Sequence, residues 1–222
     1  MYFGLERVTE TTVVAPEIVR ALTRIRRVML RVVDRLFPSA RLRYEACQIV
    51  KRAREVANTN RIVRIRSVNS NAYRAIVLST RREPITRVFI PSIRSGYIAL
   101  ERGDYESIHF IDISPNMMRC TCLYSVYLSA RADNTLQKLG VSMNPIAYRY
   151  TLCKHVVAVL ATLLTYRAID LREPWVRRGL IRGIAVLYLA TESMDRIARC
   201  RDLVVERIRR ILELPNYASG SN

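Results

Sequence analysis

The sequence is poor in the residues from which most catalytic and nucleotide-binding sites are built. Its 222 residues include only 2 His, 7 Gly and 1 Trp. It contains no phosphate loop, no glycine-rich dinucleotide fingerprint and no His-Glu-x-x-His pattern. We therefore expect a protein that is not an enzyme.

Clustered acidic residues are also scarce, and the one group that occurs has an ordinary explanation. Its members are Glu101, Asp104, Glu106 and Asp112. Paired carboxylates can bind Mg²⁺ for nucleic-acid cleavage. However, Gly103-Asp104 is typical of a hairpin turn, and no Ser or Cys near His109 is available for activation. This acidic group therefore does not change the expectation that the protein is not an enzyme.

Long hydrophobic runs and a secretory signal are missing as well. The longest apolar candidate, residues 156–165, is shorter than the roughly 20 residues that a membrane-spanning helix needs. Residues 1–6 have neither a basic start nor an apolar core. We expect reduced thiols, a cytoplasmic location and no membrane partner.

Acidic residues are half as frequent as basic ones, and lysine is rare among the basic residues. The chain has 19 Asp and Glu against 37 Lys and Arg, of which 34 are Arg, and its net charge is +18. This charge indicates a polyanionic partner, with nucleic acid as the first candidate and an anionic membrane surface as the second. Arginine suits phosphates and bases, although genome base composition or a thermophilic, archaeal source produces the same bias.

The hydrophobic pattern predicts an α+β fold. Residues 16–37 and 40–57 have helical periodicity, with Pro38 ending the first helix and Ser39 capping the second. From residue 61 the period changes to two, which predicts an antiparallel β-meander with later strands at 73–79, 86–90, 97–100 and 107–113. C-terminal helices are predicted at 153–168, 174–191 and 193–214, followed by a polar tail at 216–222.

These elements divide the chain into three predicted parts. They are a basic helical hairpin (1–60), a β-meander with a zinc module (61–168) and C-terminal helices with the tail (169–222). The net charge is +9 for residues 1–66, +2 for 67–119 and +7 for 120–222. We therefore expect phosphate contacts mainly from helices and from the zinc module.

Two short pairs of residues form the most specific pattern in the chain. Cys120 and Cys122 end a predicted strand, in which residues i and i+2 share a face. Cys153 and His155 start a predicted helix, whose N-terminus favours a thiolate. Three thiolates and one imidazole are the ligands of a closed structural zinc site, which leaves no position for a catalytic water. Ordinary buried cysteines are the alternative, but 3 of the 5 Cys and 1 of the 2 His fall in this pattern.

Cys-x-Cys followed by Cys-x-His, running directly into an aliphatic helix, resembles the SWIM zinc finger. The resemblance covers about residues 85–166 and is carried by Cys120, Cys122 and the segment 152–160. It implies a ββα-like zinc module that contacts DNA or protein partners in transposase-related, chromatin-associated and recombination-accessory proteins. The 30 residues between Cys122 and Cys153 exceed the usual spacing. We expect an insertion at 123–150, with Asp133-Asn134 and Gly140 as turns.

Candidate nucleic-acid contacts come from both helical regions. Arginine recurs at steps of three and four residues from Arg20 to Arg35, and only Asp34 interrupts this stripe, although a solvated face is the alternative. Trp175 beside paired arginines can stack on an unpaired base or pack at a helix start. Residues 148–150 offer a similar stacking platform. The candidates are Arg20, Arg24, Arg27, Arg31, Arg35, Arg41, Arg43, Lys51, Arg149, Lys154, Trp175, Arg177, Arg178 and Arg182.

Three functions fit these observations. The first is a structural or associated component of an RNA-rich particle such as the ribosome, since such proteins are small, basic and often zinc-stabilised. The second is a DNA-binding accessory in recombination or repair that partners a recombinase paralogue, as the SWIM resemblance implies. The third is a protein–protein adaptor whose charge serves solubility.

Overall fold

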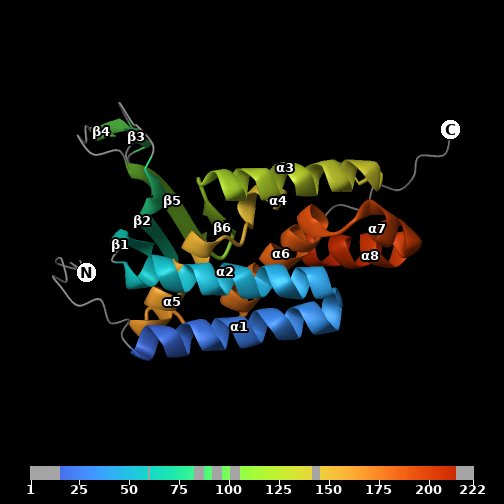
Figure 1. Cartoon of the computed structure of the whole chain (residues 1–222), viewed down its shortest axis with the longest axis horizontal. Helices are drawn as coiled ribbons and strands as arrows, with labels where there is room; N and C mark the ends of the chain where they lie inside the picture. The colour runs from blue at the N-terminus through green and yellow to red at the C-terminus, as the bar shows by residue number, and fades with distance from the viewer. Residues whose placement is uncertain are drawn as a thin grey trace.

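The computed structural model describes residues 16–59, 61–82, 88–91, 97–100, 106–141 and 146–213, and it confirms the predicted α+β class (Figure 1). A small antiparallel sheet lies at one end of the molecule, and the helices extend away from it. The predicted polar tail lies outside the described residues.

Helices α1 (Pro16–Leu36) and α2 (Ala40–Asn58) form the predicted helical hairpin. Each buries one apolar stripe because its hydrophobic side chains recur at helical spacing, as Leu22, Ile25 and Met29 do in α1. Ser39 caps the start of α2, where its side chain accepts a hydrogen bond from the Leu42 backbone N–H. Both helices pack against α5 (Lys154–Thr165).

Four strands form the main sheet in the order β1-β2-β5-β6, all antiparallel. They are β1 (Ile62–Asn69), β2 (Ala72–Arg82), β5 (Glu106–Ser114) and β6 (Met117–Cys120). The predicted antiparallel meander is confirmed, with a hairpin inserted between its second and third strands. Because β2 pairs directly with β5, the strands between them, β3 (Val88–Pro91) and β4 (Tyr97–Leu100), pair only with each other as a separate hairpin.

Helix α3 (Leu123–Lys138) occupies most of the predicted insertion, and α4 (Ile146–Arg149) follows it. The turn predicted at Asp133-Asn134 is wrong, because both residues lie inside α3. The helical spacing of the buried Leu128, Ala132 and Leu136 outweighs the turn preference of Asp and Asn. The turn at Gly140 is confirmed, since its φ of 72° is in the left-handed region that glycine favours.

The C-terminal region has α6 (Pro174–Thr191), α7 (Met194–Arg199) and α8 (Arg201–Leu212). The single helix predicted from 193 to 214 is therefore wrong, because the chain leaves helical geometry at Cys200 (φ −127°, ψ 32°). The break redirects α8 so that it packs against α6, with Ile208 and Leu212 fully buried. In the described part of the chain, no helix is long and apolar enough to cross a membrane.

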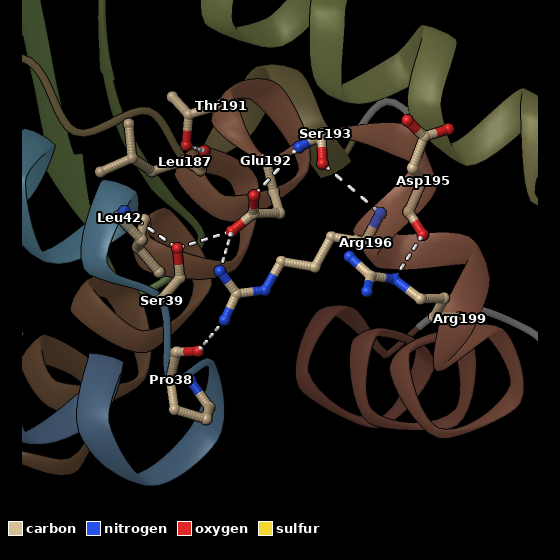
Figure 2. Close-up of polar contacts among 10 residues, drawn as sticks. All are labelled: Pro38, Ser39, Leu42, Leu187, Thr191, Glu192, Ser193, Asp195, Arg196 and Arg199. Atoms are coloured by element: carbon tan, nitrogen blue, oxygen red, sulfur yellow. Dashed lines mark hydrogen bonds and ion pairs between the residues drawn. The ribbon is translucent and has the colours of Figure 1, made fainter.

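A polar network centred on the buried Ser39 and Glu192 joins the α1–α2 turn to the α6–α7 turn (Figure 2). We call it the Glu192 network. The Ser39 hydroxyl donates to the Glu192 carboxylate at 2.5 Å, and the Ser193 backbone N–H donates to the same carboxylate at 3.1 Å. Arg196 lies 3.7 Å from this carboxylate and donates to the Pro38 carbonyl at 2.8 Å. The network fixes the two helical regions to each other with protein atoms alone.

Candidate metal centre

The structure brings the four predicted metal ligands together. The sulfurs of Cys120, Cys122 and Cys153 and a ring nitrogen of His155 all lie within 4.8 Å of one another, and all four residues are buried. The His155 Nδ1 is 3.7 Å from the Cys120 sulfur and 3.9 Å from the Cys153 sulfur. Tetrahedral zinc with ordinary bond lengths separates sulfur from nitrogen by about 3.6 Å. The cluster therefore has the donor set and nearly the dimensions of a tetrahedral metal site.

A short parallel contact places the two halves of the cluster side by side. Tyr150 forms a parallel bridge to Met118 of β6, and the Thr151 backbone N–H donates to the Met118 carbonyl at 2.7 Å. The chain continues from there to Cys153, while β6 continues to Cys120. Two ligand pairs separated by 30 residues thus converge because their flanking segments run alongside each other.

Each pair also places one cysteine at the start of a helix. Cys122 is the N-cap residue of α3, and Cys153 is the N-cap residue of α5. The prediction that Cys122 belongs to the strand is therefore wrong, since β6 ends at Cys120. Two helix N-termini now face the cluster instead of one, and the positive end of each helix dipole favours a thiolate.

The three sulfurs influence one another strongly. Burial raises the pKa of Cys120 and of Cys153, because a thiolate is costly in an apolar interior. Hydrogen bonds from the Cys120 and Cys153 thiols lower the pKa of Cys122. Without a cation, the cluster therefore favours one thiolate beside two thiols. A divalent metal supplies the charge that three thiolates require.

His155 directs Nδ1 to the sulfurs and leaves its other nitrogen buried. The Nε2 atom has no hydrogen-bond partner among the described residues, while the ring of His109 lies 4.6 Å away between centroids and is tilted by 39°. No role was predicted for His109 from the sequence. The alternation of β5 is the signal that could have found it, because His109 shares the inner face with Ile111 and Ile113.

Helix α6 supports the segment that leads to Cys153. Arg182 donates to the Tyr150 hydroxyl at 2.7 Å and lies 5.0 Å over its ring, while this hydroxyl donates to the Pro115 carbonyl. Gly183 leaves room for Leu152, since a Cβ at this position would lie 2.4 Å from the Leu152 Cγ. Through these contacts α6 packs closely against Tyr150 and Leu152, the residues on either side of Thr151.

Most of the predicted nucleic-acid contacts are exposed. Those on α1 and α2 are Arg20, Arg24, Arg27, Arg31, Arg35, Arg41, Arg43 and Lys51. Some of their charge is balanced, because Arg20 pairs with Glu17, Arg43 with Asp34 and, more distantly, Arg24 with Asp170 at 3.8 Å. Arg149, Arg177 and Arg178 are also exposed, and Lys154 is half-buried next to the cluster.

Two of the predicted contacts are placed inside the protein. Trp175 is buried and donates to the Glu173 carboxylate, so it packs at the start of α6, which is the alternative that its sequence context left open. Arg182 is buried against Tyr150 and Glu213. The prediction that Trp175 and Arg182 contact nucleic acid at the surface is therefore corrected, because both side chains are buried and make contacts within the protein.

The acidic group considered for catalysis is only partly within the described residues. Asp112 is bound by Arg74 at 2.7 Å and lies 3.7 Å from Arg119. Glu101 and Asp104 lie outside the described residues. The Asp112 carboxylate is therefore committed to arginines.

No family model, curated protein or solved structure matches this chain. The metal cluster therefore has to be interpreted from its own geometry and chemistry.

Proposed function

We propose that this protein is a non-enzymatic, zinc-stabilised, nucleic-acid-binding protein. The buried cluster of Cys120, Cys122, Cys153 and His155 carries the proposal. Four protein ligands saturate a tetrahedral ion, so the metal holds the fold and has no position left for a reacting water. Its position between β6 and the starts of α3 and α5 supports this structural role.

Zinc is the metal that this donor set favours. Thiolate sulfur selects soft ions, whereas Mg²⁺ and Ca²⁺ prefer oxygen ligands. The Cys-x-Cys and Cys-x-His pairs and the helix that follows them also agree with a SWIM-type module. Thiolates persist in a reducing compartment, so we place the protein in the cytoplasm.

Nucleic acid is the partner that the charge favours. A net charge of +18 is far beyond what solubility requires. The exposed arginines of α1, such as Arg27 and Arg31, can neutralise phosphates and release their counterions. We propose RNA before DNA, in a structural or associated component of an RNA-rich particle such as the ribosome. The SWIM resemblance favours the second candidate, a DNA-binding accessory of a recombinase paralogue.

Metal analysis and binding assays test the proposal together. Protein purified without chelator should contain about one zinc per chain by elemental analysis. Its affinity for RNA should fall steeply with salt, because counterion release dominates such binding. A folded, metal-free preparation, or an affinity that is indifferent to salt, would contradict it.

Co-purification at high salt separates the two candidates. Ribosomal particles or RNA in the retained fraction support the first, whereas DNA with a recombinase-like ATPase supports the second. Nuclease assays with Mg²⁺ or Mn²⁺ should show no turnover. Metal-dependent cleavage that is lost in Asp104→Asn/Asp112→Asn would contradict the absence of catalysis.

A further inference from the structure

The strand register arranges the outward side chains of the sheet in rows. The inner face contains Ala75, Val77, Ile111 and Ile113, all fully buried. The residues between them point to the opposite face, because successive side chains of a strand alternate. On that outer face most of the described residues are half-buried or exposed.

One row across the outer face is basic. Arg66 of β1 is opposite Arg74 of β2, Arg74 is opposite Asp112 of β5, and Asp112 is opposite Arg119 of β6. Asp112 balances part of this charge through its contacts with Arg74 and Arg119. Arg66 is exposed at the edge of the sheet and forms no ion pair with another described residue.

The neighbouring row, which we call the apolar row, has Arg64 at its edge and apolar side chains, including one aromatic ring, on β2 and β5. Arg64 of β1 is opposite Ile76 of β2, and Ile76 is opposite Phe110 of β5. Phe110 is followed across the sheet by Thr121, whose backbone N–H donates to the Phe110 carbonyl at 3.0 Å. The Thr121 hydroxyl accepts from the Phe110 backbone N–H, so its own proton remains to be donated.

The spacing of the rows fits nucleotides. Residues two apart on a strand are separated by about 7 Å, and four strands span about 14 Å. A nucleotide can therefore rest its base on the apolar row while its phosphate meets the basic row. Aromatic side chains on a sheet beside cationic side chains are the arrangement that binds unpaired bases.

We propose that this outer sheet face binds single-stranded RNA, which rests on the proposed nucleic-acid-binding function and assigns it a surface. A duplex hides the faces of its bases, so only an unpaired strand can stack on Phe110. Thr121 can donate to a 2′-hydroxyl, which DNA lacks. The charge sums concealed this face, because they assign Arg64 and Arg66 to residues 1–66 and count both faces and the loops of residues 67–119 together.

Fluorescence anisotropy with a labelled 12-nucleotide rU strand, the matching dU strand and an RNA duplex tests the proposal. Arg64→Gln/Arg66→Gln should reduce the salt slope for the rU strand by about 1.4, since each lost phosphate contact removes about 0.7. Phe110→Leu should weaken rU binding at least about fivefold and leave the salt slope unchanged. Duplex binding should change less in both variants.

Arg27→Gln/Arg31→Gln on α1 is the matched control, because it removes the same charge from another exposed surface. It should weaken binding of the single strand and the duplex to the same extent. If wild-type protein binds neither the single strand nor the duplex, both the proposed nucleic-acid-binding function and the assignment of the outer sheet face are overturned. If it binds but the two sheet variants behave like wild type, only this assignment is overturned.

Equal or tighter binding of the dU strand would overturn the choice of RNA. Phe110 is half-buried, so circular dichroism and metal content must show that Phe110→Leu folds. Arg64 and Arg66 are exposed, and their double variant tests the face independently of the core.

Discussion

Two junctions join segments that are far apart in the sequence, and their chemistry differs. The metal cluster joins the end of β6 to the start of α5, and the Glu192 network joins the α1–α2 turn to the α6–α7 turn. In the network, the buried hydroxyl and carboxylate find partners within the protein. In the cluster, burial opposes the ionisation of two thiols, and the Nε2 of His155 has no hydrogen-bond partner in the described part of the chain. The first junction is complete with protein atoms, whereas the second has a donor set that can hold a metal ion.

The largest expected effect is the loss of a metal ligand. Cys153→Ser should abolish metal retention and lower the free energy of unfolding by at least about 4 kcal/mol, the contribution of a ligand present at about 1,000 times its Kd. Elemental analysis and denaturant unfolding measure the two results. Cys47→Ser, which changes a half-buried cysteine on α2 outside the cluster, should keep the metal. Equal behaviour of the two variants would contradict the metal site.

Acidification should remove the contribution of the bound metal to the free energy of unfolding of the wild-type protein. Because the raised pKa values of Cys120 and Cys153 keep these thiols protonated at neutral pH, zinc binding must expel their protons. Protons therefore compete with the metal, and affinity falls as pH falls. Calorimetry in two buffers of different ionisation enthalpy should show the release of about two protons per zinc at pH 7. Binding without proton release would show that the thiols are already ionised.

Close packing behind the cluster predicts a smaller effect. Gly183→Ala forces a Cβ against the branched, fully buried Leu152, next to Cys153. It should destabilise the protein by about 1–3 kcal/mol and speed metal loss to a chelator. The control is Gly179→Ala, whose Cβ meets the flexible end of Met118. If Gly179→Ala is the more damaging of the two, the argument from Leu152 is wrong.

The smallest effect is expected at the Glu192 network. Ser39→Ala removes both the cap of α2 and a donor to Glu192, and should cost about 1–2 kcal/mol. Ser193 caps α7 in the same way but is exposed, so Ser193→Ala should cost less. Metal content should stay unchanged in both variants. Metal loss from Ser39→Ala would show that the two junctions are coupled.

Local patterns were sufficient for α1, α2, α5 and α6 and for the identity of the candidate ligands. The hairpin of α1 and α2 follows from helical periodicity and from Pro38 and Ser39, which act on neighbouring residues. The strand pairing was harder to predict. The rule that successive strands pair failed at β2, because pairing with β5 depends on contacts between distant residues.

At the candidate site, too, some features follow from local patterns and others depend on contacts between distant residues. The rarity of Cys and His made the four candidate ligands recognisable in the sequence. Trp175 and Arg182 were predicted at the surface, since a sequence gives their chemistry and not their burial. The role of Cys122 at the start of α3 was also missed, because Asp133-Asn134 favoured a turn in the segment that forms this helix.

The sequence by itself determined the donor set of the metal cluster, the basic charge and the periodicity of the helices, because these depend on residue type and local spacing. Only the tertiary structure decided that Tyr150 runs parallel to Met118 and so brings the ligand pairs together. It also decided that Arg66, Arg74 and Arg119 lie in one row on the sheet. The physical reason is that strand register and helix packing are set by many weak contacts between distant segments, and no local pattern records them.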